Sequence, residues 1–134
     1  MPLTWRRART WHSGGVNSTS PLSWPADLVW YTVPDLAERL GISVSRVRRL
    51  FEERILLPAR VGGVLQVPAD FLRDGEPLSE LRGTFTVLAD MGFSDDEAVH
   101  WLVCPEDSLG TSPLTALREG RKAEVRRVAQ ALGF

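Results

Sequence analysis

Between residues 30 and 67 the apolar positions change from a helical to an alternating pattern. Apolar residues recur every three or four positions over residues 34–40 and again over 43–54, which predicts two amphipathic helices. Gly41 separates them and suits a tight turn, because glycine accepts left-handed backbone angles. Over residues 59–67 the apolar positions instead flank Gly62-Gly63, which predicts a β-hairpin with a two-residue turn. The expected order is helix, turn, helix and two-stranded hairpin.

The second of these helices has an apolar and a polar face. Ser43 is placed to cap its first turn, because a serine hydroxyl accepts hydrogen bonds from the free backbone N–H groups there. With about 100° between successive residues, one stripe is apolar and is expected to be buried: Val44, Val47, Leu50 and Phe51. The other positions are polar and are expected to be exposed: Ser45, Arg46, Arg48, Arg49 and Glu52.

Helical spacing returns after a short helical turn at 68–72 and a break at 74–77. We expect a helix over 79–91, a second one after the capping box at 94–97, a short one from Ser112-Pro113 and a last one over 122–132. The predicted fold class is mainly α. It combines a winged helix-turn-helix, with its small two-stranded hairpin, and a C-terminal helical bundle.

The first 28 residues mix Arg, Trp, Ser, Gly and Pro without a period. This composition predicts a disordered basic leader, although the tryptophans Trp5, Trp11 and Trp24 leave open that part of it docks on the folded body or on a partner. The expected domains are the leader over 1–28, the winged helix-turn-helix over 29–75 and the helical domain over 76–134.

Charge is distributed unevenly along a chain that is nearly neutral as a whole. Up to Arg60 there are nine arginines against five acidic residues, and after it seven basic against twelve acidic residues. The two parts therefore carry about +4 and −5. This asymmetry indicates a basic half that faces a polyanionic partner and an acidic half that does not.

Few residues are candidates for catalysis or metal binding. Cys104 is the only cysteine, which excludes an internal disulfide and a multi-cysteine metal site and suits a reducing cytoplasm. His12 and His100 have no partner at metal-ligand spacing, and there is no phosphate-binding glycine loop. No stretch approaches the roughly 20 apolar residues of a membrane span. We therefore expect a cytoplasmic binding protein, without enzymatic activity or cofactor and without membrane attachment.

The order of helix, turn, helix and hairpin has a known use in binding duplex DNA. The second helix fits the major groove and its N-terminal side chains reach base edges, while the hairpin, or wing, contacts phosphates or the minor groove. The residues expected to contact DNA are Ser43, Ser45, Arg46, Arg48, Arg49, Arg60, Gly62 and Gly63. The alternative is that the arginines only form a solvated helix face.

Residues 33–72, VPDLAERLGISVSRVRRLFEERILLPARVGGVLQVPADFL, resemble the winged helix-turn-helix DNA-binding proteins of actinobacteria that carry an added helical C-terminal domain. The resemblance to excisionases and MerR-type proteins is more distant. The resemblance to the actinobacterial family implies DNA binding by helix 43–54 and wing 59–67. It also implies a Ser/Thr protein kinase that acts on the leader. Thr10 follows Arg6, Arg7 and Arg9 and is the candidate acceptor, where added negative charge would oppose DNA binding.

A second, shorter resemblance concerns residues 112–120, SPLTALREG, which look like the C-terminal module of some antitoxins. It leaves open a protein-interaction adaptor in which the C-terminal helices, through an exposed Trp101, grip a partner protein. The simpler alternative is a helical hairpin that covers the core of the winged unit. The preferred function is a transcriptional regulator or nucleoid-associated factor that binds double-stranded DNA.

Overall fold

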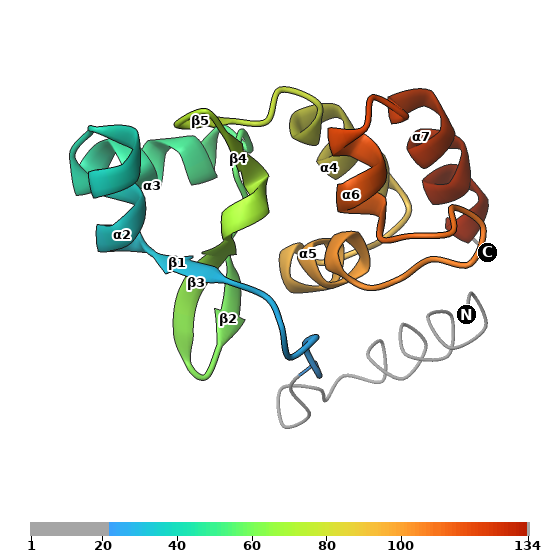
Figure 1. Ribbon diagram of the computed structural model, residues 1–134, viewed down its shortest axis with the longest axis horizontal. Coiled ribbons are helices and arrows are strands. Elements are labelled where there is room, and N and C mark those ends of the chain that lie inside the picture. The colour runs from blue at the N-terminus through green and yellow to red at the C-terminus, as the bar shows by residue number, and fades with distance from the viewer. Residues whose placement is uncertain (1–21, 134) are drawn as a thin grey trace.

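The computed structural model describes residues 22–133 and shows two lobes side by side (Figure 1). One lobe holds the first two helices and a small sheet, and the other holds the remaining helices. The helices are α2 (Val33–Leu40), α3 (Val44–Glu52), α4 (Leu81–Asp90), α5 (Asp95–Val103), α6 (Pro113–Arg118) and α7 (Lys122–Gln130). The strands are β1 (Trp30–Thr32), β2 (Ala59–Val61), β3 (Val64–Pro68), β4 (Leu72–Arg73) and β5 (Glu76–Pro77), with short 3₁₀ turns at Ala69–Phe71 and Ala131–Gly133.

Helix α2 begins and ends as the sequence predicts. The Thr32 hydroxyl accepts from the Asp35 N–H at 3.3 Å, and the Asp35 carboxylate accepts from the Thr32 N–H at 3.0 Å, so both groups of a capping box are present. Gly41 ends the helix with a φ of +69°, and its N–H donates back to the last turn. This left-handed residue turns the chain sharply into α3.

Helix α3 is capped by Ser43, whose hydroxyl accepts from the Arg46 N–H at 3.2 Å. Val47 is fully buried, and Leu50 and Phe51 are half-buried, so three members of the predicted stripe face inward. The prediction for Val44 is wrong, because its side chain is 41% exposed. Val44 opens the helix and lies about 60° around it from Val47, beyond the elements that cover the Val47 side chain.

The predicted hairpin is present but is part of a larger sheet. Strands β2 and β3 pair in antiparallel fashion around Gly62 and Gly63, whose φ angles of +61° and +82° are those of a type I′ turn. The sequence did not predict β1, which pairs with the other edge of β3 and gives the order β1-β3-β2. A strand of three residues shows no alternating pattern, so periodicity did not reveal β1.

A second, smaller hairpin follows the sheet. Strands β4 and β5 pair Leu72 with Pro77 and Arg73 with Glu76, and Asp74 and Gly75 form its turn with φ angles of +54° and +76°. The break that the sequence predicts at 74–77 is this turn together with β5.

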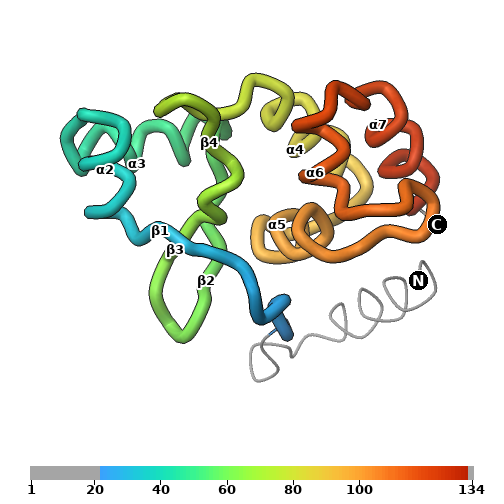
Figure 2. Tube along the Cα trace, in the orientation of Figure 1, coloured from blue at the N-terminus to red at the C-terminus, as the bar shows by residue number. Residues whose placement is uncertain are grey.

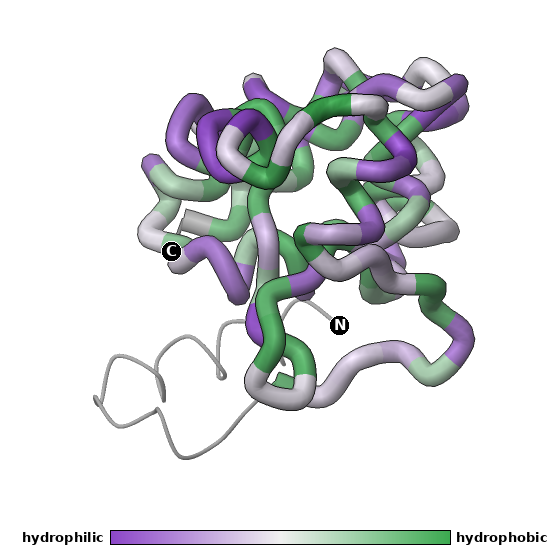
Figure 3. The backbone as a smooth tube through the Cα atoms, turned by 90° about the vertical axis from the view of Figure 1, so that its left-hand side faces the viewer, coloured by the Kyte–Doolittle hydropathy of each residue, from purple (hydrophilic) through white to green (hydrophobic). Residues whose placement is uncertain are grey.

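The C-terminal helices also begin at the predicted caps. Ser94 and Glu97 form a capping box at the start of α5, with N–H to oxygen distances of 3.2 and 2.9 Å. Ser112 caps α6, and Pro113 occupies its first turn. Apolar and polar segments alternate along the helical parts of the chain (Figure 3), as expected for elements that bury one face.

The two lobes share one continuous apolar core. Phe71, next to the sheet, and Phe85 of α4 lie with ring centroids 5.8 Å apart. Arg118 of α6 donates to the carbonyls of Asp70 and Leu72, each at 2.9 Å. The lobes are therefore held together by apolar and polar contacts, and a division of the chain into domains at 75/76 stays a prediction.

The folded body begins before Leu28. Trp24 packs edge-on against Trp30 and His100, with both ring centroid distances at 5.1 Å. A disordered leader over all of residues 1–28 is therefore wrong for residues 22–28, because the apolar ring of Trp24 is partly buried against the core. Residues 1–21 lie outside the described residues. Within 22–133, no helix combines the length and the apolar character needed to cross a bilayer.

Candidate nucleic-acid interface

The exposed face of α3 carries Ser45, Arg46, Arg48 and Arg49. At about 100° per residue, Ser45 and Arg49 each lie about 160° from the buried Val47, on the outermost line of the helix. Arg46 and Arg48 each lie about 100° from Val47, on opposite flanks. The arginines thus spread across the whole solvent-facing arc of α3.

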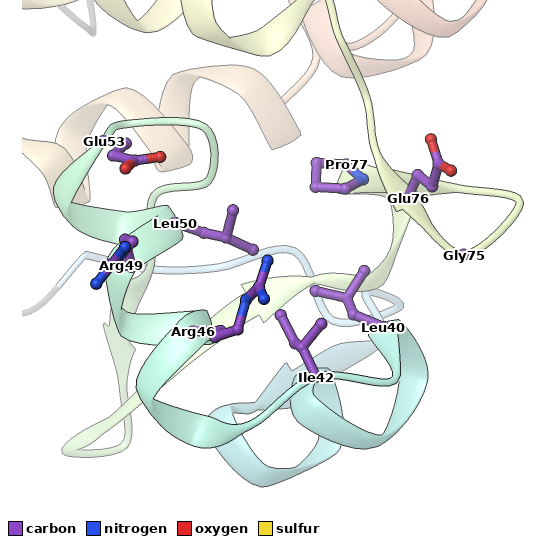
Figure 4. Close-up of a pocket in the computed structure, with 9 residues that line it drawn as sticks. All are labelled: Leu40, Ile42, Arg46, Arg49, Leu50, Glu53, Gly75, Glu76 and Pro77. Carbon is purple, nitrogen blue, oxygen red and sulfur yellow. The ribbon is translucent and has the colours of Figure 1, made fainter.

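On the Arg46 flank, a groove separates α3 from the β4–β5 hairpin (Figure 4). Its apolar lining comes from Leu40, Ile42, Leu50 and Pro77, whose side chains converge between the two elements. The Arg46 guanidinium points into this space, whereas Arg49 points away from it. Arg46 therefore lies against the apolar side chains of the groove, while the residue as a whole remains exposed.

The wing presents Arg60 and the two glycines of its turn to solvent. Gly62 and Gly63 have open space where a side chain would begin, so their backbone is accessible to a partner. Gln66 braces the hairpin, since its amide donates to the Val61 carbonyl at 3.2 Å. The Arg60 side chain is exposed, and its backbone N–H donates to the Asp96 carboxylate at 3.2 Å.

Both parts of the chain match family models. Residues 23–72 match the winged helix-turn-helix domain of DNA-binding protein Rv2175c, and residues 78–133 match the Rv2175c C-terminal domain of unknown function. The DNA-binding protein Rv2175c of Mycobacterium tuberculosis (strain ATCC 25618 / H37Rv) is 33% identical, over 78% of this chain and 80% of that protein. The chain belongs to the Rv2175c family.

The NMR structure of Rv2175c has the same fold as this family member. The two structures superpose with a TM-score of 0.75 at 31% identity, over 84% of this chain and 86% of that one. The predicted fold class and the resemblance to actinobacterial winged helix-turn-helix proteins with a helical C-terminal domain are thereby confirmed. The Rv2175c family is described as a family of DNA-binding proteins, not of enzymes.

The structure separates the predicted site residues by role. Ser43 uses its hydroxyl to cap α3, and Arg60 uses its backbone N–H to hold the wing. Ser45, Arg46, Arg48 and Arg49 have exposed side chains. Their contacts with DNA stay predictions. Thr10 lies outside the described residues, so its phosphorylation by a kinase stays a prediction as well.

Sequence reasoning missed the exposed valines of this surface. Within residues 22–133, the exposed large apolar side chains are Val29, Val44 and Val64, at 63%, 41% and 49%. Val44 opens α3, and Val64 adjoins the turn of the wing. The signal was present in the position of Val44 directly after the cap, where a helix is covered on fewer sides than in its middle.

Trp101 does not support the protein-adaptor alternative. Its side chain is 1% exposed, so the expectation of an exposed Trp101 that grips a partner is wrong. The helix α5 is buried over most of its length because it lies between the sheet and α6, and this burial takes in the Trp101 ring.

His100 has the neighbour that sequence reasoning overlooked. The Cys104 Sγ lies 3.5 Å from its Nε2 and 3.7 Å from its Nδ1, one helical turn away. Burial lowers the pKa of His100 and raises the pKa of Cys104 to about 11. The described residues contain no group of three or more potential metal ligands, and both members of this pair are half-buried.

Proposed function

We propose that this family member binds duplex DNA, with α3 in the major groove and the β2–β3 wing against the backbone. One observation carries the proposal. Arg46, Arg48 and Arg49 are exposed and, among residues 22–133, form no ion pair. Arg54 and Arg121, by contrast, form ion pairs with Asp95 and Glu124.

The spread of the arginines around α3 suits a helix that lies in a groove. Phosphates line both sides of the major groove, and base edges form its floor. Arg46 and Arg48, on opposite flanks, are placed for the two phosphate walls, whereas Ser45 and Arg49 are placed for the base edges. This assignment gives Arg46 a phosphate-binding role and Arg49 a base-reading role.

We place this activity in the cytoplasm, in a transcriptional regulator or a nucleoid-associated factor. The name of the mycobacterial relative states DNA binding without a regulatory role. The two roles differ in the ratio of specific to non-specific affinity. Binding to genomic fragments in the presence of excess unrelated duplex separates them, because a regulator retains a few fragments and a nucleoid factor retains none selectively.

The test of DNA binding is a titration of a fluorescent duplex at several salt concentrations. Neutralising one phosphate contributes about 0.9 to the slope of log affinity against log salt. We expect Arg48→Ala to lower the slope by about one, and Arg46→Ala with Arg49→Ala to abolish most binding. Arg127→Ala is the matched control, since α7 lies at the opposite end of the molecule from α3 (Figure 1). Equal affinity in all variants would refute the proposed interface.

A further inference from the structure

The wing is attached to the C-terminal lobe along its outer edge. In the order β1-β3-β2, strand β2 is an edge strand, and the side of it that faces away from β3 has no partner strand. The Arg60 N–H on that side donates to the Oδ1 of Asp96 at 3.2 Å. Asp96 is the second residue of α5, which lies beside β2 (Figures 1 and 2). A carboxylate of α5 thus takes the place of a further strand.

Asp95, next to Asp96, contacts the segment that joins α3 to the wing at the end nearest α3. Arg54 follows the end of α3 with a φ of +59° and pairs with Asp95 at 3.2 Å. The Arg54 and Asp95 side chains are 38% and 54% exposed, so this ion pair contributes little stability. The half-buried Asp96 is the stronger of the two attachments, because its partner is a backbone N–H of a sheet edge.

Apolar contacts fix the same segment. Leu56, Leu57 and Ala59 lie between α3 and the wing in the sequence and are almost completely buried. On the facing lobe, Val99 and Trp101 of α5 are buried in the same core. The segment between α3 and the wing therefore belongs to the core that α5 shares, and β2 at its end contacts α5.

We propose that the C-terminal helical lobe sets the position of the wing relative to α3, with Asp96 as the positioning residue. The proposal rests on the proposed DNA binding and gives the C-terminal domain a function. The acidic residues Asp95, Asp96 and Glu97 then have two different functions. Glu97 completes the capping box of α5, while the two aspartates hold the linker and the wing.

Electrostatics alone predicts the opposite effect for Asp96. Removing a negative charge near a DNA-binding surface raises the affinity for phosphates. If Asp96 positions the wing, its removal instead weakens binding, because the Arg60 side chain is no longer held in place. Asp96→Asn and Asp96→Ala separate the two effects. Both remove the same charge, but only asparagine keeps a side-chain oxygen that accepts from the Arg60 N–H.

The experiment measures duplex affinity and its salt slope for wild type, Asp96→Asn, Asp96→Ala, Arg60→Ala and the double variant Arg60→Ala with Asp96→Ala. We expect Asp96→Ala to bind about fivefold more weakly with a slope lower by about one, as Arg60→Ala does. Asp96→Asn should bind at least as tightly as wild type. The double variant should lose no more than Arg60→Ala, since Asp96 acts on DNA through the Arg60 side chain, which Arg60→Ala already removes.

Amide hydrogen exchange provides a readout that does not depend on DNA. The Arg60 amide should exchange faster in Asp96→Ala and remain protected in Asp96→Asn, while core amides stay protected in both and show that the chain is folded. Wild-type binding together with unchanged or tighter binding by Asp96→Ala overturns the inference alone. A wild-type chain that binds no duplex overturns the proposed function and the inference with it.

Discussion

The indole of Trp24 lies edge-on against the imidazole of His100, with ring centroids 5.1 Å apart and planes at 66°. The Nε2 of His100 donates to the Ser23 carbonyl at 2.7 Å, so a ring contact and a hydrogen bond join the same two segments. Residues 23 and 24 are thereby attached to α5, which also holds the wing.

Replacing Trp24 by alanine should lower the free energy of unfolding by about 2 kcal/mol, the loss expected for a half-buried aromatic side chain with ring partners. Urea denaturation followed by circular dichroism measures this change. Trp24→Phe is the matched control and should retain most of the stability. A loss below about 0.5 kcal/mol for Trp24→Ala would contradict this prediction, because changes of that size are typical of surface substitutions without buried contacts.

Acidification should destabilise the protein through His100. Burial lowers the pKa of His100 from its ordinary value of 6.5, against the weaker, raising effects of the Ser23 carbonyl and Glu97. The unfolded chain then binds more protons than the folded chain, so stability is full above pH 6.5 and falls as the pH decreases toward the lowered pKa.

Unfolding curves of wild type and His100→Gln between pH 7.5 and about pH 5 test this linkage. Carboxylate titrations are common to both proteins, so their effect cancels in the difference. The stability difference between the two proteins should shrink as the pH decreases. A difference that is independent of pH would contradict the lowered pKa of His100.

Cys104 should react slowly with thiol reagents in the folded protein. Its pKa rises from 9.0 to about 11 because the buried thiolate would lose solvation. At neutral pH the thiolate fraction is then about 100-fold smaller than for a free cysteine. Alkylation by iodoacetamide, followed by mass spectrometry, should be slower by about this factor than in urea. Equal rates in both states would show that the Cys104 thiol is accessible and that its pKa is not raised by folding.

Val44 should contribute to a preference for thymine. An exposed valine in the first turn of a major-groove helix is placed to contact the thymine methyl group. A duplex made with deoxyuridine lacks that methyl group, and wild type should bind it about fourfold more weakly, the effect of one buried methyl group. In Val44→Ala the difference between the two duplexes should disappear. Val29→Ala, which alters an exposed valine before β1, should keep the wild-type difference.

Local features of the fold were predictable because each depends on residues a few positions apart. Thr32 with Asp35, Ser43 with Arg46 and Ser94 with Glu97 are caps that act within a single turn. The turn at Gly62-Gly63 needs only two residues that accept positive φ angles. For the candidate site, the same local rules placed Ser45, Arg46, Arg48 and Arg49 on the exposed face of α3.

Features that join distant segments were missed or misjudged. Strand β1 exists only because β3 pairs with it, and the paired residues Trp30 and Pro68 are 38 positions apart in the chain. The burial of Trp101 and the exposure of Val44 depend on which neighbouring elements cover them. His100 and Cys104 are one helical turn apart, so helical spacing could have predicted their contact. Their burial depends on distant segments and could not be predicted in this way.

The succession of helices, the wing and the arginines on α3 follow from the residue pattern, since caps, glycine turns and helical periodicity act over short distances. Long-range packing is what joins Trp24 to the folded body, makes β2 an edge strand and lets Asp96 of α5 satisfy the free N–H of Arg60. The physical reason is that a backbone N–H or an apolar ring acquires its partner only when the chain has brought remote segments together.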